Sequence, residues 1–142
     1  MTLGARRRAL ITGGTGGVGA AVARGLAAGG YHVVITDLMA DRCEALAAEI
    51  AQTGGGAEGV ALDVTDRAQV DAVFADQDRK GGIDTLVTSA AIVKPAPILD
   101  FNPQDWARIL EVNLTGTFHC CQAAGRRMVE AGFGRIVTIS SV

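Results

Sequence analysis

The fold of this chain is decided by the stretch ALITGGTGGVG, residues 9–19. Its first four residues are apolar or β-branched and end in glycine, which predicts a short buried strand followed by a tight turn. Apolar residues then recur at helical spacing as far as Gly29 and Gly30, and a second β-branched run occupies 32–36. Residues 8–41 therefore predict a β-α-β unit with a glycine-rich turn after its first strand.

The alternation of strand and helix continues to the end of the sequence. Further strands are expected at 59–62, 83–87 and 136–139. Helices are expected from Asp41 as N-cap, from Thr65 or Asp66, and from Asn102 or Pro103 to about Ala131 with a break near Asn113. Strands that are apolar on both faces and alternate with helices indicate a parallel sheet covered on both sides. The expected fold class is α/β, a doubly wound sheet of five strands in the order 3-2-1-4-5.

Apolar spacing also predicts which side chains form the core. The expected core positions are Val18, Ala21, Val22, Gly25 and Leu26 in the first helix, Cys43, Leu46, Ala47 and Ile50 in the second, Val70, Val73 and Phe74 in the third, and Trp106 and Phe118 beyond them.

Composition excludes several classes of function. The 142 residues fit one domain, and the net charge of −2 provides no basic face for nucleic acid. No apolar stretch reaches the ~18 residues that a membrane span needs, and the first apolar run is too short for a signal peptide. The three cysteines, Cys43, Cys120 and Cys121, have no metal-binding spacing, so we expect ordinary thiols, no metal and a cytoplasmic protein.

The glycine-rich turn matches two dinucleotide-binding patterns. Residues 14–19 satisfy G-x-G-x-x-G, and Gly13, Gly17 and Gly19 satisfy a wider T-G-x-x-x-G-x-G spacing. Glycines let the chain turn tightly and approach a pyrophosphate, while the following helix offers free N–H groups and a partial positive charge. A P-loop is excluded because no Lys-Ser or Lys-Thr follows the glycines.

Two acids follow at strand ends. Asp37 ends the second strand, at roughly the 20-residue distance expected of an acid that binds the adenosine ribose. Its carboxylate can accept hydrogen bonds from both ribose hydroxyls and repels a 2′-phosphate. Gly16 adds no positive side chain, so NAD is favoured over NADP, unless Asp37 is only a solvated acid or helix cap. Asp63 ends the third strand and contacts the adenine amino group or caps the next helix.

Four motifs together resemble the short-chain dehydrogenase/reductase family over essentially the whole chain. They are Thr12-Gly13 with Gly17 and Gly19, Asp63-Val64, Asn113 within residues 111–116, and the segment 134–142 that contains Ser140 and Ser141. The resemblance implies a Rossmann fold, a single NAD(P)-binding domain over 1–142, and nicotinamide-dependent interconversion of an alcohol and a ketone. A 3-oxoacyl/3-hydroxyacyl pair or another small secondary alcohol and its ketone is the implied substrate class.

The resemblance also assigns roles residue by residue. The implied cofactor-binding residues are Gly13, Gly14, Thr15, Gly16 and Val18 around the pyrophosphate, Asp37 at the ribose, Asp63 and Val64 at the adenine, and in addition Gly17, Gly19, Leu38 and Ser89. Asn113 is the implied catalytic asparagine, which positions a water in a proton relay. Ser141 is the implied catalytic serine, whose hydroxyl stabilises charge on the substrate oxygen. The helix after Asn113 takes part in dimer contacts in the family, which implies a homo-oligomer.

The sequence departs from the family in two places. Thr88-Ser89-Ala90-Ala91 stands where the family has Asn-Asn-Ala-Gly. The family's proton donor, a tyrosine with a lysine four residues later, is absent from these 142 residues, where Tyr31 is the only tyrosine. We therefore expect a domain that is incomplete at its C-terminal end and binds cofactor without turnover. The alternatives are a non-catalytic dinucleotide-binding or interaction module and, less compatible with Thr12 and Ser141, a methyltransferase-type domain.

Overall fold

A computed structural model describes residues 7–141 of the chain, and its five strands form one parallel sheet. The strands are β1 (Arg8–Thr12), β2 (His32–Asp37), β3 (Gly56–Ala61), β4 (Thr85–Thr88) and β5 (Arg135–Thr138). Their order is β3-β2-β1-β4-β5, which confirms the order predicted from the sequence. The third, fourth and fifth strands each begin or end one to three residues from their predicted bounds.

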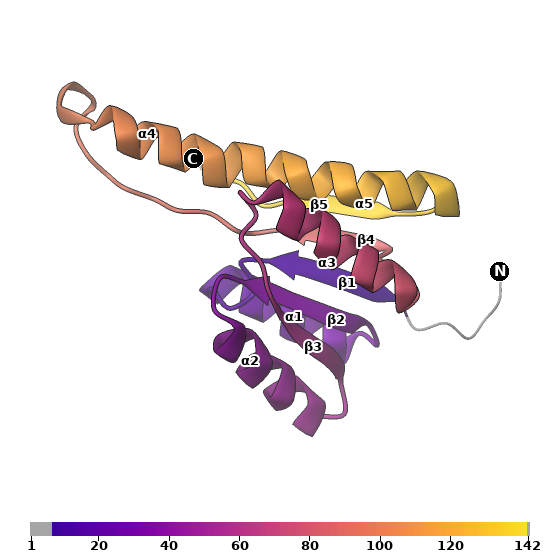
Figure 1. Cartoon of the computed structure of the whole chain (residues 1–142). Helices are drawn as coiled ribbons and strands as arrows, with labels where there is room; N and C mark the ends of the chain where they lie inside the picture. The colour runs from indigo at the N-terminus through magenta and orange to yellow at the C-terminus, as the bar shows by residue number, and fades with distance from the viewer. Residues whose placement is uncertain (1–6, 142) are drawn as a thin grey trace.

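Helices cover both faces of the sheet (Figure 1). The helices are α1 (Gly17–Ala28), α2 (Ala40–Gln52), α3 (Arg67–Arg79), α4 (Pro103–Leu110) and α5 (Thr117–Ala131), with a short 3-10 turn at Ile98–Asp100. Alternation along β1 divides the core, because Ala9 and Ile11 pack with α1 and α2 while Leu10 packs with α3 and α5. None of the helices within residues 7–141 is long and apolar enough to cross a membrane.

Helix starts agree with the sequence in two cases and differ in one. The Asp66 carboxylate caps α3 by accepting hydrogen bonds from the N–H groups of Ala68 and Gln69, and Asn102 caps α4. The expectation that Asp41 caps α2 is wrong: α2 begins at Ala40 with Met39 at its N-cap position, and Asp41 lies within its first turn. There its negative charge still favours the helix dipole.

The buried face of α1 differs from the predicted one. Its buried residues are Gly19, Ala20, Ala23 and Ala27, whereas Val18 is 55% exposed. Small side chains on this face let α1 approach the strands closely, so packing distance outweighs hydrophobic bulk in choosing the face. The stripes predicted for α2 and α3 are confirmed apart from Val73, which is half-buried.

The break predicted near Asn113 is a π-helical segment, Glu111–Gly116, between α4 and α5. The three segments form one continuous rod along the upper side of the sheet in Figure 1. Trp106 and Phe118 were expected in the core, but they are 56% and 55% exposed. Trp106 contacts the Phe101 ring edge-on at 6.5 Å between centroids and Phe118 lies beside His119, but these contacts leave more than half of each side chain exposed.

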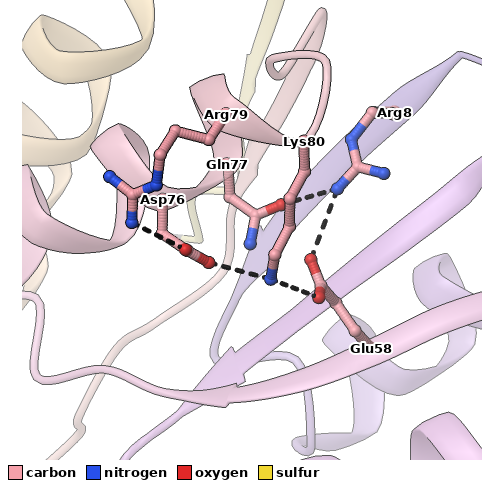
Figure 2. Close-up of polar contacts among 6 residues, drawn as sticks. All are labelled: Arg8, Glu58, Asp76, Gln77, Arg79 and Lys80. Carbon is pink, nitrogen blue, oxygen red and sulfur yellow. Dashed lines mark hydrogen bonds and ion pairs between the residues drawn. The ribbon is translucent and has the colours of Figure 1, made fainter.

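Polar contacts join α3 to two strands (Figure 2). The Arg8 guanidinium on β1 donates to Gln77 at 2.6 Å and pairs with Glu58 on β3 at 3.3 Å. The Lys80 ammonium, just after α3, bridges Glu58 at 2.9 Å and Asp76 at 2.8 Å. We call the six residues drawn in Figure 2, which also include Arg79, the α3 clip.

Candidate functional site

The carboxyl ends of the strands border a cleft of about 340 Å³. It is lined by Gly13, Gly16, Gly17, Val18, Asp37, Leu38, Leu62, Asp63, Val64, Ser89, Ala90, Ala91, Ile92, Arg108 and Val112. Nine of the residues expected to bind cofactor are in this lining. Ligands of open α/β sheets bind at this edge, where β1 and β4 diverge toward helices on opposite faces.

The phosphate loop between β1 and α1 is shaped by close backbone approach. Gly13 has φ of +60°, and a Cβ there would lie 2.7 Å from the backbone of Ala90. A Cβ on Gly19 would overlap the Gly13 carbonyl oxygen. These two glycines are therefore required by the fold of the loop itself.

Gly17 behaves differently. A Cβ at this position would meet no protein atom within 4 Å, yet Gly17 opens α1 and lines the cleft. The first turn of α1 carries no acidic residue and no side chain caps it, so its unpaired N–H groups are left for a ligand beside the cleft lining of Gly16, Gly17 and Val18. The open space and the donor set fit the pyrophosphate of a dinucleotide.

Three expected contact residues lie behind the cleft surface. Gly14 is buried, and its N–H donates to the carbonyl of Thr36 at 2.9 Å. Gly19 is buried in α1, and Thr15 turns toward Asp37. Gly14 and Thr15 therefore tie the loop to the end of β2.

The Asp37 carboxylate at the end of β2 is held by three protein donors. Its Oδ2 accepts from the Thr15 hydroxyl at 2.6 Å and the Thr15 N–H at 3.1 Å, and its Oδ1 accepts from the Leu38 N–H at 2.8 Å. The carboxylate therefore has a defined orientation beside the cleft.

Asp63 is oriented by Thr65 and does not cap α3. Its Oδ1 accepts from the Thr65 hydroxyl at 2.7 Å and the Thr65 N–H at 2.9 Å, and Asp66 is the cap. The Thr65 hydroxyl lowers the pKa of Asp63 against the opposing effect of burial, and the Arg108 charge lowers it further. Asp63 is thus an oriented, ionised acid at the cleft wall.

Arg108 and Val112 are cleft residues that sequence reasoning missed. They lie four residues apart on α4 and the following turn, so both reach the same side of the rod. The Arg108 guanidinium donates to Glu111 at 2.7 Å. The available signal was the four-residue spacing of Arg108 and Val112, which places both on one side of a helix, next to the side that carries Asn113.

The segment that departs from the family pattern still closes one wall of the cleft. The Thr12 hydroxyl accepts from the N–H groups of Ser89 and Ala90, each at 3.2 Å. The Thr88 hydroxyl is buried without a hydrogen-bond partner within residues 7–141. A threonine here leaves a polar atom unsatisfied, which costs about 1–3 kcal/mol.

The two residues expected to be catalytic lie outside the cleft lining. The Asn113 side chain pairs with the backbone of Ile92, accepting from its N–H at 2.8 Å and donating to its carbonyl at 3.0 Å. Asn113 also lines a second, mostly apolar hollow of about 390 Å³ beside α4. Ser141 is exposed three residues beyond β5, at the same edge of the sheet.

The cysteines show no feature of a reactive site. Cys43 and Cys120 are buried, and burial raises the pKa of Cys120 to about 12. The thiolate of Cys120 is therefore scarce near neutral pH. Among residues 7–141 no three His, Cys, Asp or Glu side chains gather in a way that could hold a metal ion.

Comparison with known proteins identifies relatives of this chain. A family model described as short chain dehydrogenase matches residues 7–142. D-threitol dehydrogenase of Mycolicibacterium smegmatis is 45% identical over 137 residues, which cover 94% of this chain and 52% of that protein. The 3-oxoacyl-[acyl-carrier-protein] reductase of Aquifex aeolicus is 40% identical over 135 residues, covering 94% of this chain and 54% of that protein.

Solved structures agree with these relatives. The crystal structure of a gluconate 5-dehydrogenase from Burkholderia cenocepacia, in complex with NADP and tartrate, superimposes with a TM-score of 0.90 at 40% identity. The match covers 95% of this chain and 53% of that one. The chain thus spans about half the length of the relatives it matches.

Proposed function

This chain belongs to the short-chain dehydrogenase/reductase family. We propose that it forms the cofactor-binding part of an NAD-dependent oxidoreductase that interconverts a small secondary alcohol and its ketone. The observation that carries the cofactor assignment is the Asp37 carboxylate, which is oriented beside the cleft by Thr15 and Leu38. A bound nicotinamide dinucleotide supplies hydride transfer.

The charges around the cleft support NAD over NADP. A 2′-phosphate at the ribose would face the negative charge of Asp37, and Gly16 beside it offers no cation. Arg108 is the one basic residue of the cleft lining among the described residues, and Glu111 already balances it at 2.7 Å. The NADP in the gluconate 5-dehydrogenase crystal belongs to that protein, so the preference of this chain needs its own measurement.

A direct titration tests this cofactor assignment. NADH and NADPH are added separately to the 142-residue chain, and binding is followed through the nicotinamide fluorescence. We expect NADH to bind at least tenfold more tightly than NADPH, a difference of about 1.4 kcal/mol. Equal affinities or a preference for NADPH would contradict the proposal that Asp37 selects NAD over NADP.

Two residues of this chain, Ser141 and Asn113, would take part in hydride and proton transfer, and the family's tyrosine and lysine are not among these 142 residues. Ser141 would hydrogen-bond the substrate oxygen, and Asn113 would hold the loop at Ile92 and serve the proton relay. Reduction of a carbonyl also needs a proton, which an unassisted serine hydroxyl supplies poorly near neutral pH. No tyrosine with a lysine four residues later occurs in these 142 residues, so we expect cofactor binding without turnover.

A non-catalytic dinucleotide-binding module is the second candidate, because the cleft at the strand ends could hold a dinucleotide through the loop glycines and Asp37 alone. The two candidates differ in the coding sequence beyond Val142. A tyrosine about thirteen residues after Ser141, with lysine four residues later, supports the enzyme. An immediate stop codon supports the binding module.

Self-association is a further part of the proposed function. Four apolar side chains spaced by four residues are exposed along the rod: Trp106, Leu110, Leu114 and Phe118. We call them the rod stripe. Contiguous exposed apolar side chains mark interaction surfaces, and two copies of a single stripe can pair about a two-fold axis.

A further inference from the structure

The Asp37 carboxylate can accept fewer further hydrogen bonds than an aspartate without protein partners. Each carboxylate oxygen can accept about two hydrogen bonds. Oδ2 already accepts two, from the hydroxyl and the N–H of Thr15, at 2.6 and 3.1 Å. Oδ1 accepts one, from the Leu38 N–H at 2.8 Å. One open acceptor position is left, on Oδ1.

An adenosine ribose presents two neighbouring hydroxyls, and this carboxylate has one open position to accept a hydrogen bond from one of them. A second acceptor, the Thr15 hydroxyl oxygen, lies next to the carboxylate. The Thr15 hydroxyl oxygen donates its proton to Asp37 and accepts no hydrogen bond from the residues that the structure describes. Thr15 is half-buried in the phosphate loop, immediately before Gly16, which lines the cleft.

We propose that Thr15 and Asp37 read the ribose diol jointly. One ribose hydroxyl donates to Oδ1 of Asp37, and the other donates to Oγ1 of Thr15, whose own proton stays on Oδ2 of Asp37. Thr15 is thereby a specificity-determining residue of the ribose site. This inference rests on the proposed binding of NAD and adds a second residue that hydrogen-bonds its adenosine ribose.

The direction of the Thr15 hydrogen bond has a consequence for selectivity. A free threonine hydroxyl could donate to a 2′-phosphate. Here Asp37 holds the proton at 2.6 Å, so the hydroxyl presents only lone pairs to the ligand. A phosphate oxygen without a proton is repelled by these lone pairs as well as by the carboxylate. The pair therefore favours a ligand hydroxyl over a ligand phosphate.

The test uses ADP and its 2′-deoxy and 3′-deoxy analogues, which probe the ribose site without any nicotinamide or turnover. Calorimetric titration of the full chain gives each dissociation constant. For the unmodified protein we expect each missing hydroxyl to weaken binding by about fivefold, the worth of one hydrogen bond. We call each of these fivefold losses of affinity a deoxy penalty. For Thr15→Val we expect weaker ADP binding than for the unmodified protein. One of the two deoxy penalties should disappear in this variant and the other should remain.

Two further variants complete the test. Thr15→Ser, which keeps the hydroxyl, should retain both penalties, and Thr15→Ala shows whether the valine methyl groups disturb the loop. Thr53→Val is the matched control, because it also removes a hydroxyl that donates one hydrogen bond, at 2.8 Å to the Ile50 carbonyl at the end of α2. It should leave all three dissociation constants unchanged.

The outcomes separate this inference from the proposed function. If both deoxy penalties persist in Thr15→Val and Thr15→Ala, Asp37 reads the diol alone and the inference is wrong, although NAD binding stands. A serine variant that loses one penalty also contradicts the inference. If the unmodified chain does not bind ADP at all, the proposed cofactor binding fails first.

Discussion

Cofactor preference is decided at the scale of single side chains. We expect the double variant Asp37→Ala with Gly16→Arg to favour NADPH over NADH, because it removes the carboxylate and adds a cation. Arginine can be placed there, since a Cβ on Gly16 would meet only the Gly13 carbonyl oxygen at 3.3 Å and the backbone has an ordinary φ of −72°. Fluorescence titration with both cofactors measures the change. An unchanged preference would contradict the roles of both residues.

Two glycines of the phosphate loop should respond in opposite ways to alanine. Gly13→Ala adds a Cβ 2.7 Å from the Ala90 backbone at a φ of +60°, so the free energy of unfolding should fall by about 3 kcal/mol. Gly17→Ala meets no protein atom and should stabilise α1 by up to about 1 kcal/mol. Its methyl group would instead block a pyrophosphate, and we expect about tenfold weaker NADH binding. Urea unfolding and NADH titration of both variants check this contrast.

At the scale of elements, the α3 clip makes stability depend on pH. Burial opposes the charge of Glu58, but the hydrogen bond from Lys80 and the charges of Lys80 and Arg8 outweigh it, so the pKa of Glu58 lies below its ordinary 4.5. A lowered folded-state pKa contributes stability that is fully present above the unfolded pKa. That contribution is lost as the pH falls through the folded value.

The measurement compares Glu58→Gln with the unmodified chain. The variant should be less stable by about 1–2 kcal/mol at pH 7, since hydrogen bonds to charged groups are the stronger ones. The difference in melting temperature should shrink below pH 4.5, where the unmodified carboxylate gains its proton. Glu49→Gln is the matched control, because its partner Arg24 is half-exposed and surface pairs contribute little. A pH-independent difference for Glu58→Gln would contradict the linkage.

At the scale of the whole molecule, the rod stripe should control association. Leu114 is 64% exposed, and Leu114→Glu places a charge in the centre of the stripe. We expect light scattering to show a dimer for the unmodified chain and a monomer for the variant. Leu99→Glu is the control, because Leu99 is 94% exposed and lies outside the rod, in the 3-10 turn that precedes α4. A monomeric unmodified chain would contradict the proposed self-association.

The sequence alone was enough for the order of the elements and the edge that carries the cleft. The sequence shows a strand that ends in glycine, then a helix, then a second strand that ends in an acid. Few topologies are compatible with this order, because parallel strands need right-handed crossovers. Asp37, Asp63 and the loop glycines were predictable for this reason: each lies at or shortly after the carboxyl end of a strand, and these strand ends meet at one edge.

Only the tertiary structure decided which face of each helix is covered and how the site side chains pair. Trp106 and Phe118 are exposed, and α1 turns its small residues inward, because burial depends on what packs opposite and not on hydrophobicity alone. Arg108 reaches the cleft from α4, and the Thr15 hydroxyl lies 2.6 Å from Asp37, although 22 residues separate Thr15 and Asp37 in the chain. Contacts of this kind join side chains from different elements, and their geometry exists only once those elements have packed.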